Sequence, residues 1–154
     1  MKGHTIGELR IGQSASFTKT ISEHDVYTFA GVTGDLNPAH IDEVYAKGTQ
    51  FRGRIAHGML SAGLISAVIG MQLPGPGTIY VGQELSFRAP VRIGDTITAT
   101  VTVEQLDPAR NRAVLRTVCT DQDGTCVVDG TARIMPPINQ ALNVTSVHKI
   151  SSYL

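Results

Sequence analysis

The sequence predicts an α+β domain in which one curved antiparallel sheet wraps around a single buried helix. Two observations carry this prediction. Residues 58–71 are helical in length and apolar on nearly every side, so other elements must cover them. From residue 79 onward the pattern changes to short strands separated by turns, whereas helices and loops fill most of the chain before it. A helical part followed by a run of strands is typical of the α+β class.

The first elements are predicted by local signals. Residues 14–21 read as an edge strand. Ser22 can cap the helix that follows, and Asp25, three residues later, completes a capping box. Gly34 should end this helix because glycine tolerates the positive φ of a helix C-terminus. The sequence therefore predicts a strand followed by one capped helix.

A loop interrupted by Pro38 is expected next, since proline restricts the residue before it and removes a hydrogen-bond donor. A short helical turn should begin near Asp42, and residues 47–50 read as loop. The long apolar helix, about 58–71, ends at the LPGPG break at 73–77. Four strands are then expected, at 79–87, 96–104, 112–120 and 125–135. In 96–104 threonine alternates with isoleucine, alanine and valine, the period-2 pattern of a half-buried strand.

Composition limits the function classes. The 154 residues suit one domain, which we expect at 1–137, with a tail at 138–154. Lysine plus arginine and aspartate plus glutamate both number 13, so no global charge attracts nucleic acid or an anionic membrane. The N-terminus lacks an apolar signal segment, and Cys119 and Cys126 match no metal spacing. These features predict a cytoplasmic protein with reduced thiols.

Segment 55–73 raises the question of a membrane span because it is the least polar part of the chain. It contains His57, Ser61, Ser66 and Gln72 and lacks the flanking basic asymmetry of a spanning helix. A helix buried inside a globular domain is the better interpretation.

Asp35 and His40 lie five residues apart on the loop interrupted by Pro38. A water held between a carboxylate and an imidazole can lose a proton to one group while the other positions it. Asn37 can donate to the Asp35 carboxylate and fix its orientation. Spacing alone equally allows Asp35 to be a helix cap and His40 an ordinary surface histidine.

His57 and Gly58 stand where the apolar helix begins. The first N–H groups of a helix are unpaired and lie at the positive end of its dipole, so the Gly58 N–H suits a developing oxyanion. Glycine also allows close approach to the backbone. The alternative is that Gly58 only permits tight packing and His57 is a capping residue.

Three motifs together resemble the MaoC-like, (R)-specific enoyl-CoA hydratases. They are DLNPAHID at 35–42, RIAHGML at 54–60 and LSFRAPVRIGD at 85–95, and the resemblance covers about 11–135. It implies a hot-dog fold, usually dimeric, and reversible syn addition of water to trans-2-enoyl-CoA, giving (R)-3-hydroxyacyl-CoA of short to medium chain length. No metal or other cofactor is implied.

The resemblance also implies residue roles. Asp35 and His40 would be the catalytic pair, Asn37 would orient them, and the Gly58 N–H would polarise the thioester carbonyl. Candidate substrate-binding residues are Ser61, His57 and Arg54. Candidate contacts for the phosphates of CoA are Arg52, Arg54, Arg88 and Lys47.

Alternative functions remain open at this point. A hot-dog acyl-CoA thioesterase needs a similar carboxylate, water and helix-end N–H, although the Asp-x-Asn-Pro-x-His pattern argues against it. A 3-hydroxyacyl-ACP dehydratase subunit, acting on acyl carrier protein instead of CoA, or a non-enzymatic acyl-CoA-binding module would use the same fold. A homodimer or larger homo-oligomer is expected because a single sheet leaves an uncovered face or edge.

Overall fold

The computed structural model describes residues 2–138, and its strands form one antiparallel sheet with the order β1-β3-β4-β5-β2. The tail expected at 138–154 lies, from residue 139 on, outside the described residues. The elements are η1 (Ile6–Glu8), β1 (Ser14–Thr20), α1 (Glu23–Thr33), α2 (Pro38–Ile41), α3 (Glu43–Lys47), α4 (Gly58–Met71), β2 (Ile79–Phe87), β3 (Thr96–Asp107), β4 (Arg112–Thr120) and β5 (Cys126–Met135).

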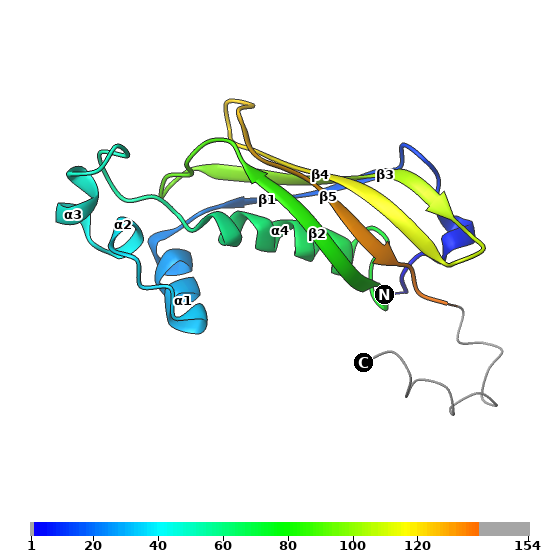
Figure 1. Cartoon of the computed structure of the whole chain (residues 1–154). Coiled ribbons are helices and arrows are strands. Elements are labelled where there is room, and N and C mark those ends of the chain that lie inside the picture. Colours follow the sequence, from blue (N-terminus) through cyan, green and yellow to red (C-terminus); the bar gives the residue numbers. More distant parts are fainter. Residues whose placement is uncertain (1, 139–154) are drawn as a thin grey trace.

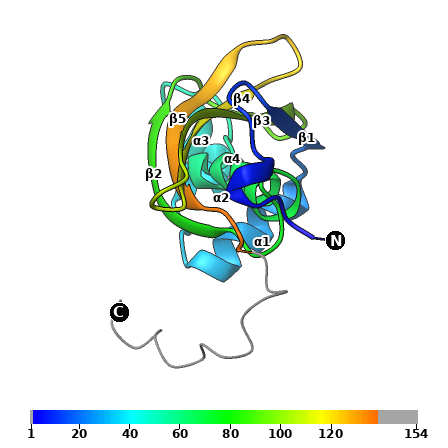
Figure 2. The ribbon, with the colours of Figure 1, turned by 90° about the vertical axis from the view of Figure 1, so that its right-hand side faces the viewer.

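The sheet curls around α4, as the sequence predicts, and the end-on view of Figure 2 shows this wrapping. In Figure 1 the three short helices α1, α2 and α3 lie together beyond the start of α4, at one end of the molecule. The two edge strands, β1 and β2, bracket this helical part in the sequence. The arrangement is that of the expected hot-dog fold.

The core lies between α4 and the inner face of the sheet. Alternate residues of β3 are buried, from Ile97 to Val103, because successive side chains of a strand point to opposite faces. They join Ile65, Val68 and Ile69 of α4 in one hydrophobic cluster. The period-2 pattern predicted for this strand is thus confirmed, and the strand runs three residues further than expected, to Asp107.

The prediction that α4 is covered on all sides is wrong for the single chain. Its inner side, including Ile65 and Val68, is buried, but Met59 and Met71 are 56% and 57% exposed. A Cβ added at Gly63 would meet no atom within 4 Å outside its own helix, so this position is open. The sheet can cover only the side of the helix that it faces, and among residues 2–138 no other element packs across the opposite side.

Local signals placed most boundaries correctly. Ser22 accepts a hydrogen bond from the Asp25 N–H, Asp25 caps in return, and Gly34 ends α1 with φ 77°. The helix expected at about 58–71 spans those residues. The loop expected around Pro38 is instead the short helix α2, with Pro38 at its first turn and Asn37 as its N-cap. Proline is favoured there because its fixed φ suits the first helical position, where no N–H is needed.

No helix within residues 2–138 has both the length and the apolar character needed to cross a membrane.

Candidate active site

The turn between α1 and α2 holds Asp35 by backbone hydrogen bonds. The Asp35 N–H donates to Thr33 Oγ1 at 3.2 Å, and the Asn37 N–H donates to Asp35 Oδ1 at 3.3 Å. The side chain of Asn37 caps α2 instead, since its Oδ1 accepts from the Ala39 N–H at 3.1 Å. Asn37 therefore contacts the Asp35 carboxylate as expected, but through its backbone and not its side chain.

His40 lies on α2, and its ring orientation is defined by one strong contact. Its Nδ1 lies 2.8 Å from the carbonyl oxygen of Ile55, and the side chain is only 9% exposed. A carbonyl can only accept, so Nδ1 carries the proton and the Nε2 lone pair remains available. The fold thus presents His40 as an acceptor at Nε2.

His57 occupies the N-cap position of α4 without a capping hydrogen bond from its side chain, and its ring lies between those of His40 and Phe29. Its Nε2 donates to the backbone oxygen of Asp35 at 2.9 Å, and its ring lies 3.8 Å from that of His40 and 4.8 Å from that of Phe29, centroid to centroid. It is 2% exposed, and its Nδ1 has no hydrogen-bond partner among the described residues. His57 therefore ties the Asp35 turn to the start of α4.

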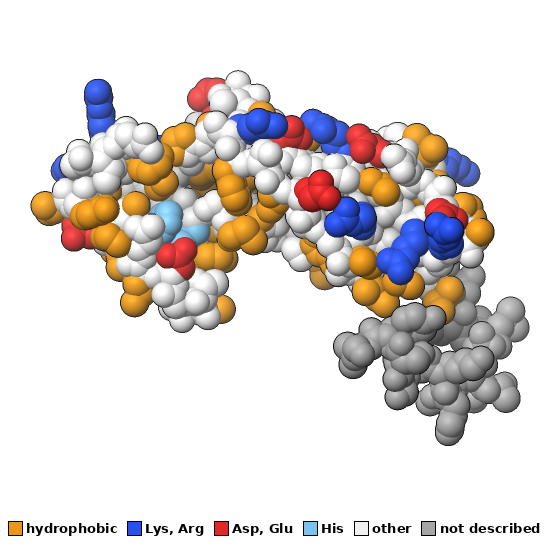
Figure 3. Space-filling view, in the orientation of Figure 1, with side chains coloured by type: hydrophobic (Ala, Val, Ile, Leu, Met, Phe, Trp, Pro, Cys, Tyr) orange, Lys and Arg blue, Asp and Glu red, His pale blue; other side chains and the backbone are white. Residues whose placement is uncertain are grey.

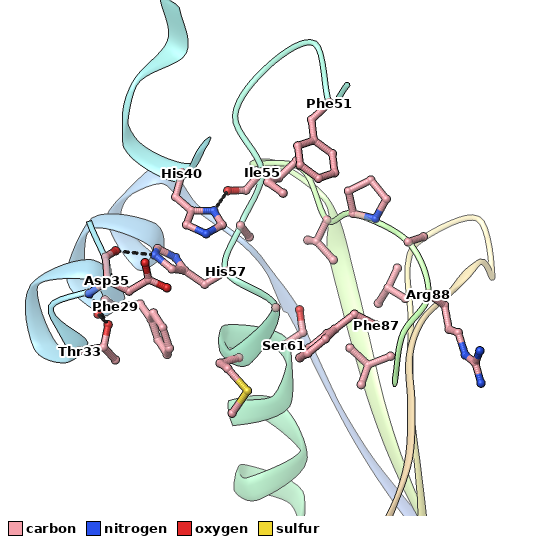
Figure 4. Close-up of a pocket in the computed structure, with 18 residues that line it drawn as sticks. Phe29, Thr33, Asp35, His40, Phe51, Ile55, His57, Ser61, Phe87 and Arg88 are labelled. Carbon is pink, nitrogen blue, oxygen red and sulfur yellow. Dashed lines mark hydrogen bonds between the residues drawn. The ribbon is translucent and has the colours of Figure 1, made fainter. Parts of the chain in front are cut away.

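These side chains open into a cavity of about 680 Å³. Figure 4 shows Asp35, His40 and His57 on one side of it and Ser61 and Phe87 on another. Figure 3 shows histidines beside an acidic group and hydrophobic side chains between the helical end and the sheet. The lining is Phe29, Thr33, Asp35, His40, Phe51, Ile55, Ala56, His57, Gly58, Met59, Ser61, Phe87, Arg88, Ala89, Pro90, Val91, Val127 and Val128.

Gly58 is required by the close approach of an aromatic ring. A Cβ at Gly58 would lie 2.6 Å from Cε1 of Phe87, well inside contact distance. Phe87 is the last residue of β2, so the edge strand and the first turn of α4 meet at this point. The Gly58 N–H, which has no backbone partner within residues 2–138, therefore lies beside the cavity.

Ser61 lies one turn further along α4 and also lines the cavity. It is fully buried, and its Oγ has no hydrogen-bond partner among the described residues. A buried hydroxyl without a partner is uncommon in proteins. The structure therefore places Ser61, a predicted substrate-binding residue, in the wall of the cavity.

Arg54, expected to bind substrate, is not brought to the cavity. Its guanidinium pairs with Glu23 and with Glu43, the latter at 3.5 Å, and donates to Tyr27 Oη at 3.0 Å. The hydrogen bond to Glu23 raises the pKa of Arg54 above its ordinary value, despite some desolvation. Arg54 thus joins α1 to α3.

The other cations named for the phosphates of CoA are divided. Arg88 lines the cavity, with its side chain 56% exposed and 3.5 Å from Asp129. Lys47 pairs with Glu43 at 3.7 Å, and neither Lys47 nor Arg52 is among the lining residues. Arg88 is therefore the cation best placed at the cavity.

Asp35, His40 and His57 are also residue types that bind metals, and one ligand atom of each lies within 4.8 Å of the others. The two imidazole planes are tilted by 33°. One ring nitrogen of each histidine is already engaged by a backbone oxygen, Nδ1 of His40 by Ile55 and Nε2 of His57 by Asp35, so each ring offers one remaining nitrogen.

Comparison with known proteins agrees with the geometry. The structure is similar to that of the R-hydratase PhaJ1 from Pseudomonas aeruginosa, with a TM-score of 0.83 and 50% identity over 88% of this chain and 86% of that one. It is also similar to the (R)-hydratase from Aeromonas caviae involved in PHA biosynthesis, with a TM-score of 0.81 and 43% identity over 84% and 98%. The fold is that of the hot-dog R-hydratase class.

Sequence comparison defines the family. The model of the MaoC like domain matches residues 8–123, and the chain belongs to this family. It is 58% identical to an (R)-specific enoyl-CoA hydratase of Rhodospirillum rubrum over 87% of this chain and 92% of that protein. It is 49% identical to a 3-hydroxybutyryl-CoA dehydratase of Methylorubrum extorquens over 84% and 82%.

Sequence reasoning missed the aromatic part of the cavity. Phe29, Phe51 and Phe87 were not named as site residues, yet all three line the cavity. A signal for Phe87 was present, since it lies in the LSFRAPVRIGD motif and ends β2 directly before the Arg-Ala-Pro stretch. Nothing local to Phe51 or Phe87 shows that they converge, because they are far apart in sequence.

Proposed function

We propose that the protein is an (R)-specific enoyl-CoA hydratase, a hydro-lyase that adds water reversibly to trans-2-enoyl-CoA and gives (R)-3-hydroxyacyl-CoA. The observation that carries the proposal is the convergence of the Asp35 carboxylate and the His40 ring on one largely apolar cavity at the start of α4. The names and high identities of the relatives support the same activity.

Asp35 and His40 act as the catalytic pair. Nε2 of His40 accepts a hydrogen bond from the attacking water, and Asp35 shares in holding it. The water oxygen bonds to C3 as the C2–C3 π bond breaks, and the pair removes a proton from the water and delivers one to C2 on the same face. Asn37 supports this arrangement by holding the carboxylate and capping α2.

The Gly58 end of α4 stabilises the charge that develops during the reaction. Conjugation makes C3 electrophilic, and attack there moves negative charge to the thioester oxygen. The unpaired N–H of Gly58 lies at the positive end of the helix and suits that oxygen. His57 and Ser61, both lining the cavity, contact the bound acyl thioester.

The substrate is a thioester of short to medium acyl chain. The apolar lining, with three phenylalanines, suits an acyl group, and Arg88 at the cavity suits a phosphate of CoA. Acyl carrier protein carries its acyl group through the same kind of thioester. The test of hydratase activity therefore also includes acyl-carrier-protein substrates, which a 3-hydroxyacyl-ACP dehydratase would use. A thioesterase would use the same cavity but would release a free thiol.

The protein assembles as a homodimer or larger homo-oligomer and works in the cytoplasm. β2 is an edge strand with an unpaired side, and its Ile79 and Val81 are exposed, as is Met59 on the uncovered side of α4. Edge strands and apolar faces of this kind are commonly covered by a second copy. The free thiols of Cys119 and Cys126 suit a reducing compartment.

The activity is tested with purified protein and crotonyl-CoA. We expect loss of the conjugated-thioester ultraviolet absorbance and formation of the (R)-3-hydroxy product, identified by chiral chromatography. Unchanged absorbance with every chain length, on CoA and on acyl carrier protein, would refute the proposal, and release of free thiol would indicate a thioesterase. Light scattering coupled to gel filtration tests the oligomer, for which a monomer mass is the contrary result.

A further inference from the structure

Arg92, which follows the Pro90–Val91 stretch, makes an unusual set of contacts. Its guanidinium donates to the backbone oxygen of Gly53 at 3.0 Å and also to that of Phe51. No acidic side chain of residues 2–138 forms an ion pair with it. The side chain is half-buried, and its guanidinium is engaged by two backbone carbonyls of one loop.

The loop that Arg92 holds has a strained turn at its centre. Arg52, between the two bound carbonyls, has φ 56°, and Gly53 has φ 154°. A non-glycine residue rarely adopts a positive φ unless surrounding contacts require it. The planar fork of Arg92 offers one nitrogen to each carbonyl in a fixed geometry, whereas a lysine has a single nitrogen on a flexible stem.

The same segment supplies the acceptor that orients His40. Ile55 follows the strained turn by two residues, and it forms an isolated β-bridge with Arg92. Its N–H donates to the oxygen of Ala39 at 3.2 Å, and its own oxygen accepts from His40 Nδ1 at 2.8 Å. The side chain of Arg92 therefore holds the loop just before Ile55, and the β-bridge joins Arg92 to Ile55 itself, whose oxygen sets the tautomer of His40.

We propose that Arg92 is a positioning residue for His40: by clamping residues 51–55 it holds the Ile55 carbonyl against Nδ1 and keeps the Nε2 lone pair turned to the cavity. The effect on catalysis rests on the proposed hydratase function, whereas the effect on the tautomer does not. Arg92 is not itself among the residues that line the cavity, so it acts through the loop that it contacts.

Steady-state kinetics on crotonyl-CoA test the catalytic part. Arg92→Met should lower kcat by about 10- to 100-fold, as small misplacements of catalytic groups do, with a smaller change in KM. Arg92→Lys, which keeps the charge but loses the fork, should give an intermediate loss. Arg112→Met is the matched control, since Arg112 is exposed at the start of β4 and away from the loop, and it should keep full activity.

Nitrogen-15 NMR of histidine-labelled protein tests the tautomer directly. His40, assigned by its loss in His40→Gln, should be protonated at Nδ1 in the unaltered protein and should gain Nε2-protonated form in Arg92→Met but not in Arg112→Met. An unchanged His40 tautomer with unchanged kcat overturns the proposal. A fall in kcat and melting temperature with an unchanged tautomer also overturns it, because that result describes a purely structural role.

If no substrate is turned over, the hydratase function fails, and the NMR result still decides the positioning role by itself.

Discussion

Two hollows of the molecule differ in how they treat their charged groups. The cavity at the start of α4 is lined mostly by apolar side chains around Asp35, His40 and His57. The other, about 460 Å³, lies at the far end of β3 and β4 and is lined by Arg110, Arg112 and Arg133 among other residues.

The far hollow is lined by more arginine side chains than the cavity at α4, but they are exposed to water. Arg133 pairs with Glu84 at 2.9 Å and Arg110 with Asp107 at 3.9 Å, and all four side chains are substantially exposed. Water screens such pairs, so they contribute little. In the cavity at α4, one ring nitrogen of His40 and one of His57 are each held by a backbone oxygen, and both side chains are buried, where electrostatic interactions are stronger. Surroundings, more than the number of charges, separate a reactive site from a solvated surface.

The largest expected effect tests this contrast directly. Asp35→Asn and His40→Gln should each lower kcat by about 10²- to 10⁴-fold, the usual contribution of a general acid or base. Arg110→Met, in the far hollow, should leave kcat unchanged. The measurement is hydration of crotonyl-CoA, with circular dichroism to confirm folding. Near-normal turnover in either site variant would remove that residue from the mechanism.

A smaller effect is expected from filling the space over Gly58. In Gly58→Ala the new methyl group would meet the ring of Phe87 and displace it, so kcat/KM should fall about 10- to 100-fold. Gly31→Ala is the matched control, because a Cβ there meets nothing within 4 Å and alanine favours the interior of α1. Equal activities of the two variants would contradict the role given to this contact.

A capping contact away from both hollows should change stability without changing activity. Ser22→Ala should lower the free energy of unfolding by about 1 kcal/mol at pH 7. Burial alone would raise the pKa of Asp25, but hydrogen bonds from the Ser22 side chain and backbone and the nearby Lys19 outweigh it, so the pKa is lowered.

The contribution of Asp25 to the free energy of unfolding depends on pH. A lowered carboxyl pKa stabilises the fold fully above the unfolded value, near 3.8, and this contribution is lost as pH falls through the lowered pKa. Urea unfolding should give a difference in the free energy of unfolding between Ser22→Ala and the unaltered protein that is smaller in acid than at pH 7. A constant difference would show that Asp25 takes no part in the cap.

The smallest effect concerns the two thiols. Burial raises the pKa of Cys119 to about 12, and its Sγ donates to the backbone oxygen of Ser61 at 3.6 Å. Cys126 is only half-buried. Because the thiolate is the reactive form, Cys126 should react with Ellman's reagent at pH 8 well before Cys119. The Cys126→Ser protein keeps only Cys119, and the Cys119→Ser protein keeps only Cys126. Equal rates of reaction of these two proteins with Ellman's reagent would contradict the burial of Cys119.

Local signals explain what was predictable from the sequence. The Ser22–Asp25 cap, the stop at Gly34 and the limits of α4 depend on residues close together in the chain, and the structure has all of them. The strand alternation of β3 was equally readable. The proposed catalytic pair depends on the resemblance, since spacing alone left Asp35 and His40 open to ordinary structural roles.

Contacts between distant segments explain what was not predictable. Arg54 looked free to bind phosphate, but Glu23 and Glu43, brought together by folding, engage it. Phe87 reaches Gly58 only because β2 returns beside the start of α4. The short helix α2 escaped prediction because Pro38 was interpreted as a breaker and not as a first helical residue.

The placement of the short helices beyond the sheet has a consequence for heat resistance. In Figure 1, α1, α2 and α3 lie past the start of α4, where α2 and α3 contact each other more than they contact the strands. Segments with few contacts to the core open locally at lower free energy than the central strands. On warming, the groups around His40 should separate while β3, β4 and β5 remain paired, so the protein becomes inactive at a temperature at which it is still folded.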